Sequence, residues 1–428
     1  MISLYKAEDM RKEDIFTREM RFDPKIEKTV DEILENVRLN GDQALYEYNR
    51  KFDRADLLSL EVSQIEMQEA YSKTAPEFLE TLKLAGNNIE DFHRHQVRNN
   101  FVITDRPGVV LGQKITPVEK AGIYVPGGTA AYPSTVLMNA IPARIAGVKE
   151  LIMVTPPNPD GSVNPEILAA AQISGVSHVY KAGGAQAIAA LSFGTQSIPR
   201  VDKITGPGNV YVATAKRRVF GMVDIDMIAG PSEILVIADE TAEPVRVAAD
   251  LLSQAEHDRM ASAVLVTNSS KLAKEVRKEL ERQLLSLPRS EIARASIEKN
   301  GKIILVKSIE EAVEISNEIA PEHLELSVED PFKILGSVKN AGSVFLGTQV
   351  PEALGDYLAG PNHTLPTGGT ARFSSPLSVD DFVKKSSFIY YTADALNEVG
   401  DQVIGFARTE GLDGHARAIS VRTKGELL

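Results

Sequence analysis

From Val109 onward the sequence alternates short apolar runs with amphipathic ones, and glycine or proline separates them. The apolar runs include AGIYV, ELIMV, EILVIA, SAVLV and KIILV, and helical patterns such as STVLMNAIPARIAG and PEILAAAQISG lie between them. Short buried strands between amphipathic helices are the signature of βα units, which build parallel sheets. The alternation predicts an α/β fold with two Rossmann-like parallel-sheet domains.

The two series of βα units suggest where these domains begin and end. Residues up to about Arg98 are polar and helical in period, and the residues from Ala393 to Leu428 also have a helical pattern. We therefore expect four parts, namely an N-terminal helical arm over 1–25, a large α/β domain over 26–120 and 232–375, a second α/β domain on the cofactor side over 121–231, and a C-terminal helical tail over 376–428.

Composition excludes several classes of partner. The 428 residues carry a formal charge of −12, which repels a phosphate backbone and disfavours nucleic acid and anionic membranes. The charged N-terminal segment has no apolar signal core, and no run of about 18 apolar residues occurs to span a bilayer. These features predict a cytoplasmic protein without a membrane partner. The absence of cysteine excludes disulfides, thiolate ligands and a cysteine nucleophile.

One glycine motif has two interpretations. Gly206-Pro207-Gly208 follows a predicted strand and opens a predicted helix, but Tyr211 occupies the place of the third glycine of a dinucleotide fingerprint. The motif is either a plain strand-to-helix turn or a contact to a phosphate or cofactor. The domains therefore lack a standard dinucleotide fingerprint.

The histidines divide into two groups. We interpret His93, His95 and His178 as structural, because they lie in a regular helix or strand without a shared face. The remaining four occur in polar, turn-flanked segments with carboxylates nearby, which favours a shared site: His257, His323, His363 and His415.

A metal ion is the simplest target for some of these side chains. Gln254 and His257 are one helical turn apart and leave the same face of a predicted helix. Together with Asp356 and a distant histidine they form a sulfur-free ligand set that suits zinc or another first-row divalent ion. The adjacent Glu322 and His323 suggest a pair of general bases, although such pairs also occur by chance.

Longer blocks of the sequence resemble a known family. The blocks AGIYVPGGTAAYPSTVLMNAIPARIAGV, KAGGAQAIAAL, KITGPGNVYVATAK, APEHLEL and GDYLAGPNHTLPTGGTARF, with the segment from Asp226 to Asp258, resemble histidinol dehydrogenases along essentially the whole chain. The resemblance implies zinc bound by Gln254, His257, Asp356 and His415. It also implies that these four residues contact substrate together with Ser232, His323, His363 and Glu410, and that NAD contacts Tyr124, Gln186 and Asn209.

The implied reaction is oxidation of L-histidinol to L-histidine by two hydride transfers to NAD, with an aldehyde between them. The resemblance assigns Glu322 and His323 to proton transfer, and His323 is the base that we expect to remove the hydroxyl proton. Because the chain has no cysteine, water must add to the aldehyde, and Glu322 is the expected base for that water. The zinc is expected to act as a template for the imidazole and amine of the substrate.

The resemblance further suggests a homodimer in which the tail that carries Glu410 and His415 completes the partner's site. Two other functions stay open on sequence alone. One is a metal-dependent hydrolase with Glu322 as base and no redox step. The other is a metal- or nucleotide-binding module without catalysis.

Overall fold

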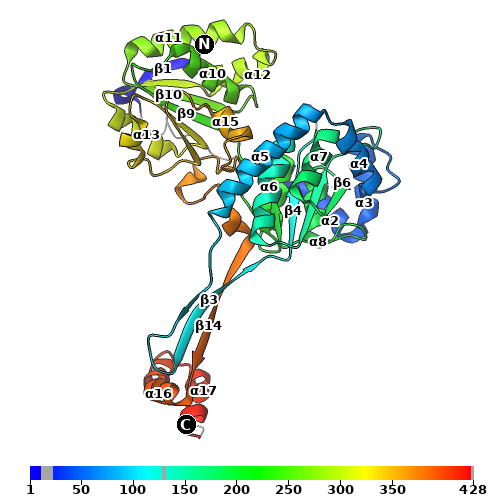
Figure 1. Ribbon diagram of the computed structural model, residues 1–428, viewed down its shortest axis with the longest axis vertical. Coiled ribbons are helices and arrows are strands. Elements are labelled where there is room, and N and C mark those ends of the chain that lie inside the picture. Colours follow the sequence, from blue (N-terminus) through cyan, green and yellow to red (C-terminus); the bar gives the residue numbers. More distant parts are fainter. Residues whose placement is uncertain (11–22, 128–131, 426–428) are drawn as a thin grey trace. The chain divides into compact units, whose positions relative to one another are not determined.

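Figure 1 shows the computed structural model of the chain, which describes residues 1–10, 23–127 and 132–425. The chain divides into two compact units. The first comprises Met1–Gln96 and Val118–Phe382, and the second comprises Val97–Pro117 and Val383–Leu428. Within the described residues, no helix is both long and apolar enough to cross a bilayer.

The first unit contains a six-stranded sheet in the order β1-β11-β10-β9-β12-β13, and all of its strand pairs are parallel. This finding confirms the α/β pattern of the sequence. The strands are β1 (Ser3–Lys6), β9 (Glu233–Ala238), β10 (Ser262–Thr267), β11 (Lys302–Leu305), β12 (His323–Ser327) and β13 (Ser343–Leu346).

Helices cover both faces of this sheet. Successive residues of β9 point to opposite faces, so Ile234 and Val236 join one apolar core while Leu235 and Ile237 join the other. This burial on both sides explains why the strand is a continuous apolar run. The first core contains α10 (Pro244–Ala255), α11 (Ser270–Leu284) and α12 (Ser290–Lys299), and the second contains α13 (Ile309–Ile319) (Figure 1).

A five-stranded parallel sheet in the same unit has the order β6-β5-β4-β7-β8. Strands β5 and β6 lie on one side of β4, whereas β7 and β8 lie on the other. The order in which the strands are added to the sheet therefore reverses between β4 and β7. The strands are β4 (Lys120–Tyr124), β5 (Glu150–Thr155), β6 (His178–Lys181), β7 (Lys203–Thr205) and β8 (Asp224–Ile225), and the helices that connect them are α6 (Pro133–Ala146), α7 (Pro165–Ser174), α8 (Gly184–Phe193) and α9 (Val210–Val219).

The helices before residue 95 belong to the core of the five-stranded sheet. Leu45 packs in one cluster with Ile152, and Ile89 packs in another with Leu151. The sequence assigned residues 26–120 to the domain of 232–375, so this packing corrects the assignment. An amphipathic pattern reveals that a helix has an apolar face but not which sheet covers that face. The helices are α2 (Pro24–Asn40), α3 (Asp42–Tyr48), α4 (Gln64–Lys73) and α5 (Pro76–Arg94), with a π-helical turn η2 over Asn49–Asp53.

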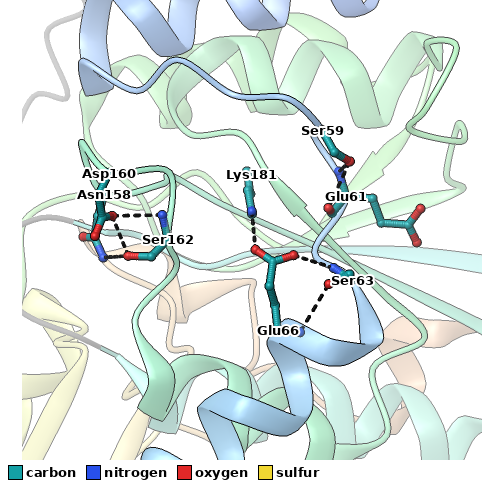
Figure 2. A network of polar contacts seen from close by, with 8 residues as sticks. All are labelled: Ser59, Glu61, Ser63, Glu66, Asn158, Asp160, Ser162 and Lys181. Atoms are coloured by element: carbon teal, nitrogen blue, oxygen red, sulfur yellow. Dashed lines mark hydrogen bonds and ion pairs between the residues drawn. The ribbon is translucent and has the colours of Figure 1, made fainter.

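Polar contacts anchor the start of α4 to this sheet, as Figure 2 shows. Ser63 and Glu66 form a capping box in which each side chain accepts a hydrogen bond from the other's backbone N–H, at 3.2 and 2.8 Å. Lys181, the last residue of β6, donates a hydrogen bond to the carboxylate of Glu66. The helix therefore begins at the carboxyl end of a strand of the sheet that it covers.

The N-terminal residues differ from the expected helical arm. Ser3–Lys6 is the edge strand β1, parallel to β11, and Ala7–Asp9 is a short 3-10 turn, η1. A strand of four residues is too short to show a clear period, and its partner lies about 300 residues away in the sequence. Residues 11–22 of the expected arm lie outside the described residues.

The second unit pairs two distant segments. Strand β3 (Val109–Pro117) runs antiparallel to β2 (Phe101–Ile103) and along the full length of β14 (Val383–Tyr391). Two helices follow, α16 (Ala393–Thr409) and α17 (Asp413–Thr423), which confirms the helical pattern from Ala393. The expected helical tail over 376–428 is thus corrected at its start, because β14 depends on a strand about 270 residues earlier. The remaining short elements belong to the first unit: α14 (Pro331–Leu335), α15 (Glu352–Tyr357), η3 (Thr370–Arg372) and η4 (Val379–Phe382).

Candidate active site

The candidate site is built around the amino end of β12. His323 is the first residue of this strand, which lies between β9 and β13, and Glu322 precedes it. Both residues are buried, with 4% and 8% of their surface exposed. Open parallel sheets usually bind ligands at the carboxyl ends of their strands. Here the functional pair lies at the opposite edge of the sheet.

One residue of the neighbouring strand holds both members of the pair. The backbone N–H of Glu233, at the start of β9, donates to the carboxylate of Glu322 at 2.9 Å. The carbonyl oxygen of Glu233 lies 2.9 Å from Nδ1 of His323. Because a carbonyl only accepts, Nδ1 carries a proton and donates it. Nε2 is therefore the basic atom of the neutral ring.

Two carboxylates on α15 lie beside this ring. Oδ1 of Asp356 is 3.7 Å from Nε2 of His323. Glu352 is one helical turn earlier on the same face, since residues four apart on a helix are neighbours. One potential ligand atom from each of His323, Glu352 and Asp356 lies within 4.8 Å of the others. These groups form a compact set with the donor types that bind divalent cations.

Gln254 reaches the same set from the last turn of α10. Its side chain is 1% exposed. When its amide nitrogen faces Glu352, that nitrogen donates to the carboxylate oxygens at 3.2 Å. The same nitrogen lies 3.1 Å from Nδ1 of His323, but Nδ1 carries its own proton for Glu233 and does not accept this bond. In this orientation the amide oxygen is the atom left to bind a ligand. The structure thus brings Gln254 to the predicted place.

His257 and His363 lie close enough to feel the same charges. The negative charge of Asp356 acts on both rings, and the charge of His323 opposes it. Loss of surrounding water is the larger effect in each case and lowers the pKa of both histidines below the usual value. This effect is smaller for His257 than for a fully buried group, because the residue is exposed at the surface. Neutral imidazoles are the form that binds metals or accepts protons. The predicted residues Gln254, His257, His323, Asp356 and His363 are therefore assembled together.

The pKa values of the central groups reflect opposing influences. Burial disfavours the charged form of His323, but the carboxylates of Glu322, Asp356 and Glu352 outweigh it and raise its pKa to about 9. For Glu352 burial dominates and raises the pKa to about 8. Burial also opposes ionisation of Asp356, yet its contact with His323 holds its pKa below the usual value. Without a bound cation, His323 thus supplies the positive charge of the site.

Glu352 is the main residue that the sequence reasoning missed. It is 2% exposed, and Ser253 donates a hydrogen bond to its carboxylate at 3.0 Å. Its backbone N–H donates to Glu325 at 2.8 Å, and Glu325 shares a hydrogen bond with Asp250. The i,i+4 spacing of Glu352 and Asp356 in PEALGDY was the available signal.

A cavity of about 260 Å³ adjoins these groups. His323, Asp356 and His363 contribute to its wall, and the remaining wall comes from β13 and the segment that follows it. Nε2 of His323 and Nε2 of His363 are both buried without a hydrogen-bond partner among the described residues. Buried polar atoms are normally satisfied, so these nitrogens suit a group that enters the cavity. The donor set of imidazole, carboxylate and amide oxygen fits zinc.

The three residues expected to contact NAD share one edge of the five-stranded sheet. Tyr124 ends β4, Gln186 lies in the first turn of α8 after β6, and Asn209 is the N-cap of α9 after β7. The hydroxyl of Tyr124 accepts a hydrogen bond from Gly184 N–H at 3.1 Å, and burial raises the pKa of Tyr124 to about 12. This is the carboxyl edge, where parallel sheets bind nucleotides at a reversal of strand order.

The remaining predicted residues lie in two places. Ser232 immediately precedes Glu233, and its carbonyl oxygen accepts a hydrogen bond from Ser262 at 3.0 Å. Glu410 and His415 belong to the second unit, where Glu410 ends α16 and His415 lies in the first turn of α17. Both side chains are exposed. They are available to a second molecule.

Comparisons with known proteins show the family of this chain. A family model described as histidinol dehydrogenase matches residues 16–423. Histidinol dehydrogenase of Clostridium acetobutylicum is 58% identical over 407 residues, which cover 95% of this chain and 94% of that protein. The Bacillus cereus protein of the same name is 57% identical over 401 residues, 94% and 93% of the two chains. A crystal structure of histidinol dehydrogenase from Elizabethkingia anophelis has a TM-score of 0.95 at 41% identity and covers 99% of this chain and 98% of that one. The chain belongs to the histidinol dehydrogenase family.

Proposed function

We propose that this chain is a zinc-dependent enzyme that oxidises L-histidinol to L-histidine with NAD, through histidinaldehyde, in the last steps of histidine biosynthesis. Family membership supports the reaction. The observation that carries the mechanism is the pair Glu322 and His323, held by the two backbone groups of Glu233 next to a buried set of metal-binding side chains.

The residues that would hold zinc are Gln254, His257 and Asp356, with His415 from a second copy of this chain. One potential ligand atom from each of His323 and Glu352 lies within 4.8 Å of Asp356, and the carboxylate of Glu352 would add negative charge next to the ion. When bound, a divalent cation gives the imidazole and amine of the substrate a common anchor, and its charge lowers the pKa of His323 into the range of a general base.

The chain's own groups then handle the protons. Nδ1 of His323 stays bonded to Glu233, so Nε2 accepts the proton of the substrate hydroxyl as hydride leaves the carbinol carbon. Before the second hydride transfer the aldehyde adds water. Glu322 is the adjacent carboxylate that takes the proton of this water, and no cysteine exists to form an adduct instead.

NAD is proposed to lie at the carboxyl edge of the five-stranded sheet. Tyr124 and Asn209 flank the reversal of strand order between β4 and β7, and Gln186 follows the neighbouring β6. The glycine-rich turn after β7 lets backbone approach the cofactor closely. The domain thus serves NAD without a standard fingerprint.

The enzyme is proposed to be a cytoplasmic homodimer in which Glu410 and His415 complete the partner's site. The second unit supports this arrangement by its surface. Strands β2 and β14 expose a set of large apolar side chains that a monomer would leave in water: Phe101, Val102, Ile103, Phe388, Ile389 and Tyr390. Because successive residues of a strand point to opposite faces, both faces of this sheet expose large apolar side chains, which suits contact with another protein.

The decisive experiment follows absorbance of NADH after L-histidinol and NAD are added to the purified protein, before and after treatment with a chelator. We expect two NADH per histidinol, loss of activity with the chelator and recovery with zinc. Protein that contains metal and binds NAD but forms no NADH would overturn the proposal.

A further inference from the structure

The turn after β7 lies at the reversal of strand order in the five-stranded sheet. Gly206 follows this strand and packs against the end of β4. Its φ is +113°, and a Cβ atom at this position would lie 2.1 Å from the carbonyl oxygen of Tyr124. Only glycine permits this approach. The turn and the end of β4 therefore form one wall at the expected cofactor edge.

A buried ion pair holds both polar groups of this glycine. The carboxylate of Asp226, just after β8, accepts a hydrogen bond from Gly206 N–H at 2.8 Å. The ammonium of Lys216 donates to the carbonyl oxygen of Gly206 at 3.0 Å, and it also pairs directly with Asp226. The two side chains are 2% and 1% exposed. Every polar atom of the Gly206 backbone is thus bonded to this pair.

The ion pair of Lys216 and Asp226 is better explained by positioning than by stability. A buried ion pair contributes little net stability compared with apolar residues of the same size, but it fixes the position of the groups that it bonds. Lys216 belongs to α9 and lies two helical turns after Asn209, the N-cap of that helix. Asn209 accepts hydrogen bonds from the N–H groups of Tyr211 and Val212, at 3.0 and 3.2 Å. The ion pair therefore joins the turn, the cap and the helix.

We propose that Lys216 and Asp226 are positioning residues for NAD, which hold the Gly206-Pro207-Gly208 turn and Asn209 against Tyr124 in the geometry that binds the cofactor. This inference rests on the proposed NAD site. It assigns the glycine motif to cofactor binding rather than to chain reversal alone. Neither residue touches NAD, and each acts through the backbone of Gly206.

The test compares NADH affinity with stability in the full-length, zinc-loaded protein. The double variant Lys216→Met/Asp226→Leu removes both charges together, so neither is left buried and unpaired. We expect the dissociation constant for NADH, measured by fluorescence titration, and the KM for NAD to rise by about tenfold or more. The KM for L-histidinol and the zinc content stay unchanged. Asp226→Asn retains an oxygen acceptor for Gly206 N–H and gives a smaller rise.

Lys203→Met is the matched control. Lys203 is also a buried lysine in an ion pair on the same sheet, 2.9 Å from Asp224, but it lies at the opposite end of β7 from the turn. This control is expected to lower the melting temperature and leave NADH affinity unchanged. Wild-type affinity in both Lys216→Met/Asp226→Leu and Asp226→Asn overturns the inference, provided that the wild-type protein oxidises L-histidinol. A wild-type protein that neither binds NADH nor forms it contradicts the proposed function instead.

Discussion

Nδ1 of His323 lies 2.9 Å from the carbonyl oxygen of Glu233, and this contact determines which nitrogen of the ring can accept a proton. The same residue, at the amino end of β9, also donates its backbone N–H to the carboxylate of Glu322. Glu322 and His323, the residue before β12 and the first residue of that strand, are thereby both held by one residue of β9. The pair that we propose for proton transfer therefore has its geometry before substrate binds.

His323→Asn tests the role of Nε2. An asparagine amide nitrogen can replace Nδ1 as the donor to Glu233, but the side chain has no counterpart of Nε2. We expect kcat to fall by a factor of about 10² to 10⁴ while the melting temperature stays near that of the wild type. In His323→Gln the amide lies one carbon further from the backbone and loses the bond to Glu233, so this variant should have both a lower kcat and a lower melting temperature. Equal stability loss in the two variants would argue against the contact to Glu233.

Glu322→Gln tests the water base. The amide oxygen still accepts the hydrogen bond from Glu233 N–H, so the fold should persist. We expect oxidation of histidinaldehyde to slow more than oxidation of histidinol, because only the aldehyde must add water. Single-turnover NADH formation from each substrate measures both steps. Equal slowing would count against Glu322 as the base for water.

Above about pH 7 the metal-free protein should lose stability as the pH rises, because His257 and His363, whose pKa values are lowered, are already neutral in both states there. Glu352 has a raised pKa of about 8 in the folded state, so the folded state holds a proton that the unfolded state has lost above its ordinary pKa of 4.5. His323, raised from 6.5 to about 9, adds stability that is complete below pH 6.5 and disappears as the pH passes 9. Both effects have the same sign, and each contributes at most about 1.4 kcal/mol per pH unit.

Urea unfolding between pH 5 and 9 in the presence of a chelator measures this dependence. In Glu352→Gln the free energy of unfolding should depend less on pH between about pH 5 and 8. Added zinc should stabilise the protein most at high pH, because ligands bind metal in their deprotonated forms. A metal-free protein whose stability increases between pH 7 and 9 would contradict the charge arrangement.

Glu352→Gln should also weaken metal binding. Glu352 holds the amide of Gln254 and adds negative charge next to Asp356. Loss of such a supporting carboxylate typically costs 10- to 100-fold in affinity, so we expect a change of about that size in a competition titration with a chromophoric chelator. Glu314→Gln, an exposed glutamate on α13, is the control and should bind zinc like the wild type.

The shared site of the proposed dimer can be tested by mixing. His323→Asn and His415→Asn should each be inactive, since one lacks the base and the other lacks the ligand given to the partner. After joint refolding, half of the dimers are mixed and each contains one intact site, so about a quarter of the wild-type activity should return. No recovery, with mixed dimers demonstrated by mass spectrometry, would place His415 in the site of its own chain.

Much of the fold could be predicted from local pattern. The strand Glu233–Ala238 coincides with the apolar run EILVIA, because a strand that is buried on both faces of a parallel sheet is a continuous apolar segment. The predicted helix that carries both Gln254 and His257 is wrong at its end, because α10 stops at Ala255 and His257 lies in the turn that follows. Local pattern did not show which sheet the helices α2 to α5 cover, since their apolar faces fit either sheet.

The candidate site shows the same division. By itself, the sequence determined which residue types are candidates for the chemistry, that no cysteine takes part, and that the chain resembles histidinol dehydrogenases. Only the tertiary structure decided that the pair Glu322 and His323 lies at the amino edge of its sheet, that Glu233 holds it, and that Glu352 joins Asp356. Hydrogen bonds between residues 89 or 90 positions apart depend on how strands are ordered and aligned, which no local pattern records.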